Sequence, residues 1–570
     1  MHVATTVRRY KGKEYKTRLV RRTFREGGKV KHETIANISG LPESVVAGLE
    51  KLLAGVDLVE AGTDFEVERS LGHGHVAAVL GTMRRLGIAG LLSSRPSRER
   101  TLVEAMIAAR ILRPGSKLAT ARWWSGTTLP SELGLDTAAD EDDLYAAMDW
   151  LLARQETIQK KLAAQRLSEK GLVLYDLSSS YFEGRTCPLA KLGHSRDERR
   201  HSLQVEYGLL TDAVGCPVAV QVFEGNTADT RTVMAQVDRL RTSFGIREFV
   251  LVGDRGMITK TRIEELRSLE GIGWITALKA ASIQQLYRKG AFQLSLFDDR
   301  NLAEIKHPDY PGERLVVCRN PFLAEERRRK REELLVGTEK QLATIQQRVG
   351  AGRLAGADKI GLAVGKVVNK FKMAKHFDLA IEESSFAYSR KTDAITAEAA
   401  LDGFYIIRAS AHSDLNAEDT VRAYKKLADV EQAFRCIKTV DLEIRPIGHR
   451  LEDRVRAHIF LCMLAYYVEW HMRRALAPML FEEENLGLVR SERDPVAPAQ
   501  KSPATTEKAR RRKDSDGNPI HSFRSLLDEL SSLRRDLCRY TGLPEQPQFT
   551  KTTLSTPLQR KALELLGTHP

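Results

Sequence analysis

Leu172–Asp176 (LVLYD) and Phe249–Asp254 (FVLVGD) are two short apolar runs that each end in an aspartate. Continuous Val and Leu runs are typical of buried parallel strands, and ligands bind at the carboxyl ends of such strands in open α/β sheets. A third carboxylate, Glu431, lies on an expected helix much further along the chain. Three carboxylates that converge on one edge of a sheet are best suited to hold a pair of hard divalent cations for phosphodiester chemistry. The sequence therefore predicts a metal-dependent site made of Asp176, Asp254 and Glu431.

The composition favours a polyanionic partner. The chain has 570 residues, enough for several domains, and its 89 basic and 75 acidic residues give a formal net charge of +14. Nucleic acid is the commonest partner of such a chain, although a basic protein without a nucleic-acid partner is the alternative. The six cysteines are scattered and include no C-x-x-C pair, which argues against a zinc site and against a disulfide framework.

The sequence also predicts a soluble intracellular protein with no membrane partner. The N-terminal residues contain no apolar segment typical of a secretory signal. The longest apolar stretch, Ile459–Val468, is too short to span a bilayer.

Residues 1–60 are expected to form a basic, β-rich module. Between Arg8 and Glu33 there are eleven Lys or Arg residues against three Glu, a net charge of +8. Glycines at positions 12, 27 and 28 separate three alternating segments, which predicts a small β-meander. The cations indicate either an arm that follows phosphates or a solvated charged face.

Residues 61–170 are predicted to be a helical, DNA-binding domain. Thr101–Leu112 and Lys117–Trp124 are helix-length runs on either side of Pro114-Gly115, an arrangement similar to a helix-turn-helix. Such a pair of helices occurs more often in ordinary bundle packing, and both interpretations stay open.

The expected fold class is α/β, with an RNase H-like mixed sheet as the catalytic core. Residues 171–280 alternate strands and helices in the order β-β-β-α-β-α-β, which is the order of such a sheet. Glu431 follows Asp254 by 177 residues, so residues 281–400 are expected to be an insertion domain and residues 401–485 the second part of the core. Residues 486–570 begin rich in Pro, Ser and Lys, which predicts a linker followed by a helical C-terminal tail.

The expected glutamate helix, Tyr424–Lys438, has a mixed polar stripe. At 100° per residue, Tyr424, Glu431 and Lys438 fall within about 20° of one another, and Arg435 lies nearby. A solvated salt-bridge face would contain the same residues, so the helix alone is ambiguous. The two aspartates at strand ends favour a catalytic role.

Several other enzyme classes lack their sequence motifs here. Asp176 is followed by Leu177 and Ser178, without the second aspartate that aspartyl phosphatases need. The chain contains no complete Walker A sequence, no H-E-x-x-H and no G-x-S-x-G.

A set of short segments carries a specific family resemblance. They are Gly193–Asp197, Gln204, Gly208–Asp212, Gly215–Pro217, Phe223–Asp229, Gly253–Met257 and Leu401–Phe404. Together they resemble the core of the DDE transposases of bacterial insertion sequences, over about residues 171–475. Tyr424, Glu431 and Lys438 resemble the Tyr-x2-Arg-x3-Glu-x6-Lys pattern of the insertion-sequence-four superfamily. Leu427 occupies the arginine position of that pattern, and Lys425, Lys426 or Arg435 would supply the cation instead.

The resemblance implies a cut-and-paste DNA transposase. Asp176, Asp254 and Glu431 would bind two Mg²⁺ ions, with Mn²⁺ as a substitute, one ion activating the attacking oxygen and the other stabilising the leaving oxygen. Water would nick the end of the element, and the 3′-hydroxyl would then attack the opposite strand or the target DNA. The implied partners are the terminal inverted repeats, the target DNA and a second copy of the chain in a homodimeric synapse. The implied location is the nucleoid of the bacterial cytoplasm.

The same resemblance implies a set of DNA-binding residues around the carboxylates. They are Tyr424, Lys425, Arg435, Lys438, Arg255 and Asn226. Two alternatives stay open: a stand-alone nuclease of RNase H-like fold, and a catalytically inactive DNA-binding protein derived from a transposase.

Overall fold

The computed structural model describes residues 1–56, 65–135, 139–197, 199, 201–293, 297–298, 300–411, 414–541 and 547–569. Its central element is an eight-stranded sheet in the order β10-β11-β14-β9-β8-β5-β6-β7. The predicted boundary between residues 60 and 61 lies outside the described residues. No helix within the described ranges is both long enough and apolar enough to cross a membrane.

Five strands of this sheet form the catalytic core that the sequence predicts. They are β5 (Gly171–Tyr181), β6 (Gln204–Thr211), β7 (Pro217–Glu224), β8 (Phe249–Val252) and β9 (Ile272–Ala277). Strand β5 runs parallel to β8, and β8 runs parallel to β9, whereas β6 is antiparallel to both β5 and β7. The strand order and directions are those of an RNase H-like core, so the predicted fold class is confirmed.

Helices connect these strands and cover the sheet. They are α8 (Gln155–Arg166), α9 (Asp229–Thr242), α10 (Lys260–Arg267), α11 (Ala280–Arg288), α15 (Ala417–Lys425) and α16 (Leu427–Arg435). Helix α16 packs on β5, α8 on β7 and α10 on β9. The strands are buried because both faces of the sheet are covered, which explains their continuous apolar sequences.

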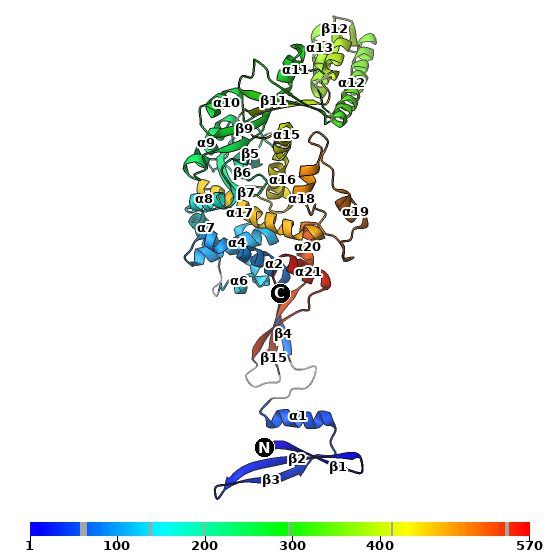
Figure 1. Cartoon of the computed structure of the whole chain (residues 1–570). Coiled ribbons are helices and arrows are strands. Elements are labelled where there is room, and N and C mark those ends of the chain that lie inside the picture. Colours follow the sequence, from blue (N-terminus) through cyan, green and yellow to red (C-terminus); the bar gives the residue numbers. More distant parts are fainter. Residues whose placement is uncertain are drawn as a thin grey trace.

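The predicted insertion begins later than expected. Strands β10 (Leu302–Ile305) and β11 (Glu313–Arg319) lie in the expected insertion, yet they extend the main sheet through β14 (Phe404–Ser410). Their side chains alternate between two buried faces of the sheet, so they cannot be separated from it. A second hydrophobic core begins only with α12 (Pro321–Gly350), which Figure 1 shows with α13 at one end of the molecule.

The inserted body itself is a small helix-and-hairpin unit. It consists of α12, α13 (Ala357–Phe371), β12 (Phe377–Ile381), β13 (Phe386–Arg390) and α14 (Thr392–Ala399). Helices α12 and α13 pack together, and the β12–β13 hairpin covers them with apolar side chains such as Phe377 and Phe386.

The helical region before the sheet does not form a core of its own. Helix α17 (Glu452–Leu476) packs against α4 (Arg98–Leu112), α7 (Glu141–Leu152) and β7, and a single hydrophobic core joins these elements. Ten of the fifteen residues of α4 are buried, and Lys117 at the start of α5 (Lys117–Trp123) is buried too. Helices α4 and α5 are therefore packed in a bundle. This agrees with the second of the two interpretations that the sequence left open, ordinary bundle packing instead of a helix-turn-helix. The region also contains α2 (Gly74–Arg85), α3 (Ile88–Leu92) and α6 (Leu129–Glu132).

The predicted linker and helical tail contain strands as well as helices. The elements are α18 (Leu486–Glu492), α19 (Pro503–Arg511), α20 (Phe523–Ser531), β15 (Arg534–Tyr540), β16 (Gln548–Thr552) and α21 (Pro557–Leu565). Strand β15 pairs with β16 and with β4 (Phe65–Gly72), from the other end of the chain. The prediction of a wholly helical tail is wrong because pairing with β4, distant in sequence, decides the state of residues 534–540.

The N-terminal module is the predicted β-meander closed by a helix. Its elements are β1 (His2–Tyr10), β2 (Lys13–Glu26), β3 (Lys29–Asn37) and α1 (Glu43–Leu53). Both hairpins turn through two residues with positive φ, Lys11-Gly12 at +48° and +77° and Gly27-Gly28 at +58° and +75°. Such turns match the right-handed twist of the paired strands, which is why glycine occurs in both. A small core of Val20, Ile38 and Val46 joins the sheet to α1.

Candidate active site

The register of the sheet brings the two aspartates to one edge. Leu174 of β5 lies opposite Val252 of β8 in a parallel pairing. Asp176 and Asp254 each come two residues later, so both follow the last paired position in the same direction. Strand β5 continues past this point to Tyr181 alongside β6, whereas β8 ends and the chain turns at Asp254.

Glu431 is presented to this edge by α16. Val430, Ala433 and Phe434 are buried and pack the helix on the sheet, with the Phe434 ring 5.8 Å from the ring of Tyr207. Glu431 itself is exposed on the neighbouring side of the helix. The burial of one side therefore fixes the direction in which the carboxylate points.

The three carboxylates interact electrostatically. The pKa of Asp176 is raised to about 6, mainly by burial and in smaller part by the charges of Asp254 and Glu431. The backbone N–H of Leu177 and the guanidinium of Arg196 act in the opposite direction. Oxygen ligands and a local excess of negative charge are what a divalent cation requires. The ligand oxygens of these three residues do not all lie within 4.8 Å of one another, so a shared ion would have to draw them closer.

Tyr424 also reaches the carboxylates, but through a different helix from Glu431. Its hydroxyl donates to Asp254 Oδ1 at 3.4 Å, and burial raises the pKa of the phenol, which keeps that donor protonated. The predicted single helix Tyr424–Lys438 is wrong, since α15 ends at Lys425, α16 starts at Leu427, and a π-turn spans Cys436–Val440. At the break, Lys426 N is shared between Arg422 O and Ala423 O, and Asp429 N bonds to Lys426 O in an i→i+3 contact.

Lys438 is buried and paired instead of lying free beside the cluster. Its Nζ lies 2.6 Å from Asp197 Oδ1 and donates to Ser178 Oγ at 3.1 Å. Arg445 lies 2.5 Å from the same oxygen of Asp197, whose Oδ2 accepts from the backbone N–H of Tyr181. Burial lowers the pKa of Lys438, and Asp197 opposes that shift. The two cations line an open pocket of about 320 Å³.

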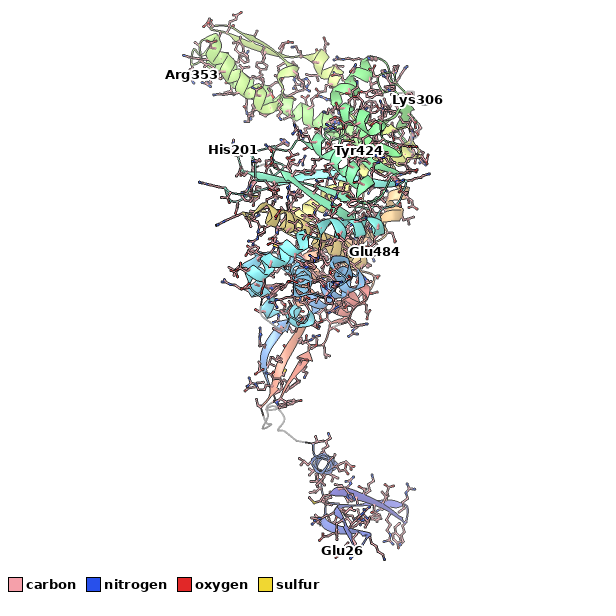
Figure 2. All side chains as sticks on the ribbon, turned by 90° about the vertical axis from the view of Figure 1, so that its left-hand side faces the viewer. Glu26, His201, Lys306, Arg353, Tyr424 and Glu484 are labelled. Atoms are coloured by element: carbon pink, nitrogen blue, oxygen red, sulfur yellow. The ribbon has the colours of Figure 1, made fainter. Side chains whose placement is uncertain are left out.

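The other predicted DNA-binding residues divide into two groups. Arg255 is exposed in the turn after Asp254, Asn226 is exposed in the turn after β7, and Arg435 is exposed on α16. Lys425 is directed elsewhere, since its Nζ donates to the carbonyl oxygens of Val496 and Ala497. Figure 2 labels Tyr424, which lies between the labelled residues Lys306 and Glu484 in that view.

The arginine position of the superfamily pattern belongs to the core in this chain. Leu427 is only 8% exposed and packs in the main hydrophobic cluster, so that position offers no cation to a ligand. Lys426 is half-buried, and its electrostatic neighbours are Arg490 and Asp429, not the three predicted catalytic carboxylates.

Arg196 and Asp229 belong to the site although sequence reasoning gave them no role. Arg196 donates to Asp229 Oδ2 at 2.7 Å and lies within electrostatic reach of Asp176. Asp229 begins α9, and its carboxylate and that of Asp254 both lie near Gly256. Both residues lie in segments of the family resemblance. A single Arg and a single Asp without a partner at a characteristic spacing give no pattern from which a role could be predicted.

The glycines of the resemblance have a structural role. Gln204 Nε2 donates to Gly225 O at 2.8 Å. A Cβ on Gly225 would lie 1.9 Å from Gln204 O, and a Cβ on Gly193 would lie 1.9 Å from Gly225 O. A side chain at Gly193 or Gly225 would therefore collide with the backbone of the neighbouring segment. The loop that carries Arg196 and Asp197 depends on these close backbone contacts.

A second acidic cluster does not fit a cation. Cys436, Asp441 and Glu469 place ligand atoms within 4.8 Å of one another, and all three are buried. The Arg473 guanidinium lies 2.6 Å from both carboxylates, so the positive charge that the cluster needs is already supplied by the chain.

Two family models match parts of this chain. The family described as Transposase DDE domain matches residues 183–468, which include Asp254 and Glu431 and begin after Asp176. The N-terminal domain of the IS1634 family transposases matches residues 3–62. A cryo-EM structure of a piggyBac transposase synaptic complex with hairpin DNA is similar over 70% of this chain and 72% of that chain, at 7% identity and a TM-score of 0.33. No curated protein matches the sequence.

Proposed function

Since this chain belongs to the transposase DDE domain family, we propose that Asp176, Asp254 and Glu431 are the carboxylates with which it cuts and joins DNA. The family consists of DNA transposases, and the chain is accordingly an enzyme of metal-dependent DNA strand cleavage and strand transfer. The observation that carries the assignment is the parallel register of β5 and β8, in which both aspartates follow the paired Leu174 and Val252 by two residues.

Mg²⁺ is the metal that we infer for this site. All three candidate ligands are carboxylate oxygens, and hard oxygen donors select Mg²⁺, with Mn²⁺ as a substitute. Bound divalent ions would supply Lewis-acid stabilisation to the attacking and leaving oxygens of a phosphodiester. Asp176 has to lose its proton before it can act as a ligand, and burial opposes that loss.

The neighbouring side chains position these carboxylates and the DNA. The Tyr424 hydroxyl holds Asp254 through its hydrogen bond, and Arg196 balances the charge of Asp176 from the side of Asp229. Arg196 thus provides a cation near the carboxylates where Leu427 provides none. The exposed Arg255 and Arg435 would contact DNA phosphates.

Two further roles follow from the chemistry of joining ends. Lys438 would contact a phosphate beside the scissile bond, in exchange for part of its contact with Asp197. Transposition joins two element ends, so two active sites are needed and a homodimeric synapse of this chain is proposed. A DNA substrate of this kind would place the protein at the nucleoid.

A strand-transfer assay tests the proposal. The full-length protein is incubated with duplexes that carry the inverted repeats flanking its gene, a target plasmid and Mg²⁺. We expect cleaved ends and joined products, both lost on chelation, and both lost in Glu431→Gln but kept in the matched control Glu264→Gln, an exposed glutamate on α10. Cleavage without joining would indicate a stand-alone nuclease, and binding without cleavage would indicate an inactive derivative; either result overturns the proposal.

A further inference from the structure

The N-terminal sheet has two unlike faces. Residues directly opposite each other in antiparallel strands share a face, so the register assigns every side chain. One face, called here the helix face, is covered in part by α1: Arg18 donates to Glu43 of that helix at 2.5 Å, and Val20 packs with Val46. Figure 1 shows α1 on one side of the sheet only.

The opposite side of the sheet, called here the open face, is rich in cations and aromatic rings. Its charged and aromatic members are His2, Arg8, Tyr10, Lys13, Tyr15, Arg21, Arg25 and His32. Side-chain contacts confirm that they share a face, since Thr23 and His32 are hydrogen-bonded at 3.0 Å and the rings of His2 and His32 lie 6.5 Å apart. Tyr10 and Tyr15 are 60% and 54% exposed.

All carboxylates of the module lie away from the open face. Glu14, Glu26 and Glu33 of the sheet alternate onto the helix face, and the two remaining glutamates of residues 1–56 are on α1. On the helix face several cations have glutamate partners, for example Lys31 with Glu26 at 2.5 Å and Arg9 with Glu14 at 3.5 Å. Glu26 is labelled in Figure 2. Within residues 1–56, the open face therefore carries four Lys or Arg side chains and no carboxylate.

We propose that the open face of the N-terminal sheet binds the phosphate backbone of duplex DNA. The inference rests on the proposed function, which supplies DNA as the partner, and assigns the contact to one face. Cations grouped without acids repel one another, and a polyanion removes that cost. Strand β2 has 14 residues and spans roughly 45 Å, longer than one turn of B-DNA. The exposed tyrosine hydroxyls add donors of the kind that contact phosphates.

The same distribution of charge argues against a second copy as the occupant of the open face. If the open faces of two copies came together, the cations of Arg8, Lys13 and Arg25 would face cations of the other copy, with no carboxylate between them. The helix face is a poorer DNA surface, because it carries the three glutamates of the sheet, several of its cations already pair with glutamates, and α1 covers part of it.

Two triple variants of the full-length protein test the assignment. The open-face triple is Arg8→Ala, Lys13→Ala and Arg25→Ala. The helix-face control is Arg9→Ala, Lys16→Ala and Arg22→Ala. Both triples remove two Arg and one Lys from β1 and β2, all six side chains are exposed, and the change in net charge is the same.

Binding is measured by fluorescence anisotropy with a short labelled duplex of mixed sequence over a series of salt concentrations. We expect the open-face triple to weaken binding at least about tenfold and to reduce the slope of log K against log salt by about 2.7, or about 0.9 for each lost phosphate contact. The helix-face control should stay close to the wild type. Equal losses in both triples, or a greater loss in the control, would overturn the proposal.

Two additional measurements separate this inference from the proposed function. Cleavage by the wild type is measured separately. A wild type that binds DNA but never cuts it would contradict the catalytic assignment, and the comparison of the two triples would still test the open face. Vesicles of anionic phosphatidylglycerol form the second arm. If the open-face triple lost vesicle binding and kept duplex binding, the open face would be a membrane surface and the proposal would be wrong.

Discussion

The catalytic sheet and the N-terminal sheet gather charge of opposite sign by different means. In the catalytic sheet, parallel register and a packed helix bring Asp176, Asp254 and Glu431 to one edge, where Asp176 is largely buried and the other two are exposed. In the N-terminal sheet, strict alternation sends all the carboxylates to one face and leaves the other face with cations alone, and both faces stay largely exposed.

The difference shows what each charge cluster requires of the fold. A buried carboxylate with like charges beside it, such as Asp176, is costly and needs a rigid support, which the covered eight-stranded sheet provides. Exposed like charges cost little in water and need only a regular surface, which a three-stranded meander with a core of three buried residues can provide. In both sheets the chain leaves an excess of charge that a ligand of opposite sign would neutralise.

The largest expected effect separates the two sheets by function. Asp176→Ala should reduce cleavage at least about a thousandfold, equivalent to about 4 kcal/mol, because a metal ligand is lost. DNA affinity should be unchanged or higher, because a negative charge near the phosphates is removed. Parallel cleavage and anisotropy assays measure both quantities, with Asp238→Ala, an exposed aspartate on α9, as the control. If Asp176→Ala lost as much DNA affinity as the open-face triple, the two sheets would not differ in function as proposed.

The next effect concerns the support of the catalytic sheet. Asp197→Ala should lower the free energy of unfolding by about 4 kcal/mol, because the cation of Lys438 then stays buried without its partner. The matched change in the N-terminal sheet, Glu14→Ala, removes an exposed partner of Arg9 and should cost less than about 1 kcal/mol. Urea denaturation monitored by circular dichroism gives both values. Similar losses would show that burial does not distinguish the two sheets.

The charge cluster at the catalytic edge should also respond to pH. The folded-state pKa of Asp176 is about 6 against an ordinary value of 3.8, so this group's contribution to stability is fully present below about pH 4 and is lost as the pH rises through 6. Without metal, Asp176→Asn should therefore gain about 3 kcal/mol relative to the wild type between pH 4 and pH 8. Added Mg²⁺ at pH 8 should raise the melting temperature of the wild type and not that of the variant. If the difference in stability between the variant and the wild type did not change with pH, the pKa of Asp176 would not be raised in the folded state.

The smallest effect is expected in the N-terminal sheet. The open-face triple should change the free energy of unfolding by less than about 0.5 kcal/mol, because exposed cations without acidic partners contribute little to stability. Thermal melting with and without salt checks this value. A large loss of stability would mean that these side chains support the sheet. The weaker DNA binding of the open-face triple would then follow from partial unfolding and not from lost phosphate contacts.

Much of the catalytic core could be predicted because its signals are local. The apolar runs before Asp176 and Asp254 are short and uninterrupted, and glycines mark both hairpins of the N-terminal module. The predicted fold class and family are confirmed, whereas the roles of Asp176, Asp254 and Glu431 stay predictions that the geometry supports.

The errors arose where distant contacts decide local structure. The helix expected at Tyr424–Lys438 is broken, and the 100° spacing cannot reveal a break of that kind. Lys425 donates to carbonyl groups seventy residues away, a contact that no local pattern encodes. Pairing between β15 and β4 joins opposite ends of the chain, and the side chains of residues 534–540 alone did not specify a strand.

The single hydrophobic core that joins α4, α17 and α21 has a consequence for the order in which this protein matures. The N-terminal module closes its own core within the first 53 residues, so it can fold soon after it leaves the ribosome. The catalytic edge depends on α16, and α17 and α21 belong to the same continuous core, so the edge is complete only when most of the chain has been made. If the open face binds duplex DNA as proposed, a chain that stops early would bind DNA without cutting it.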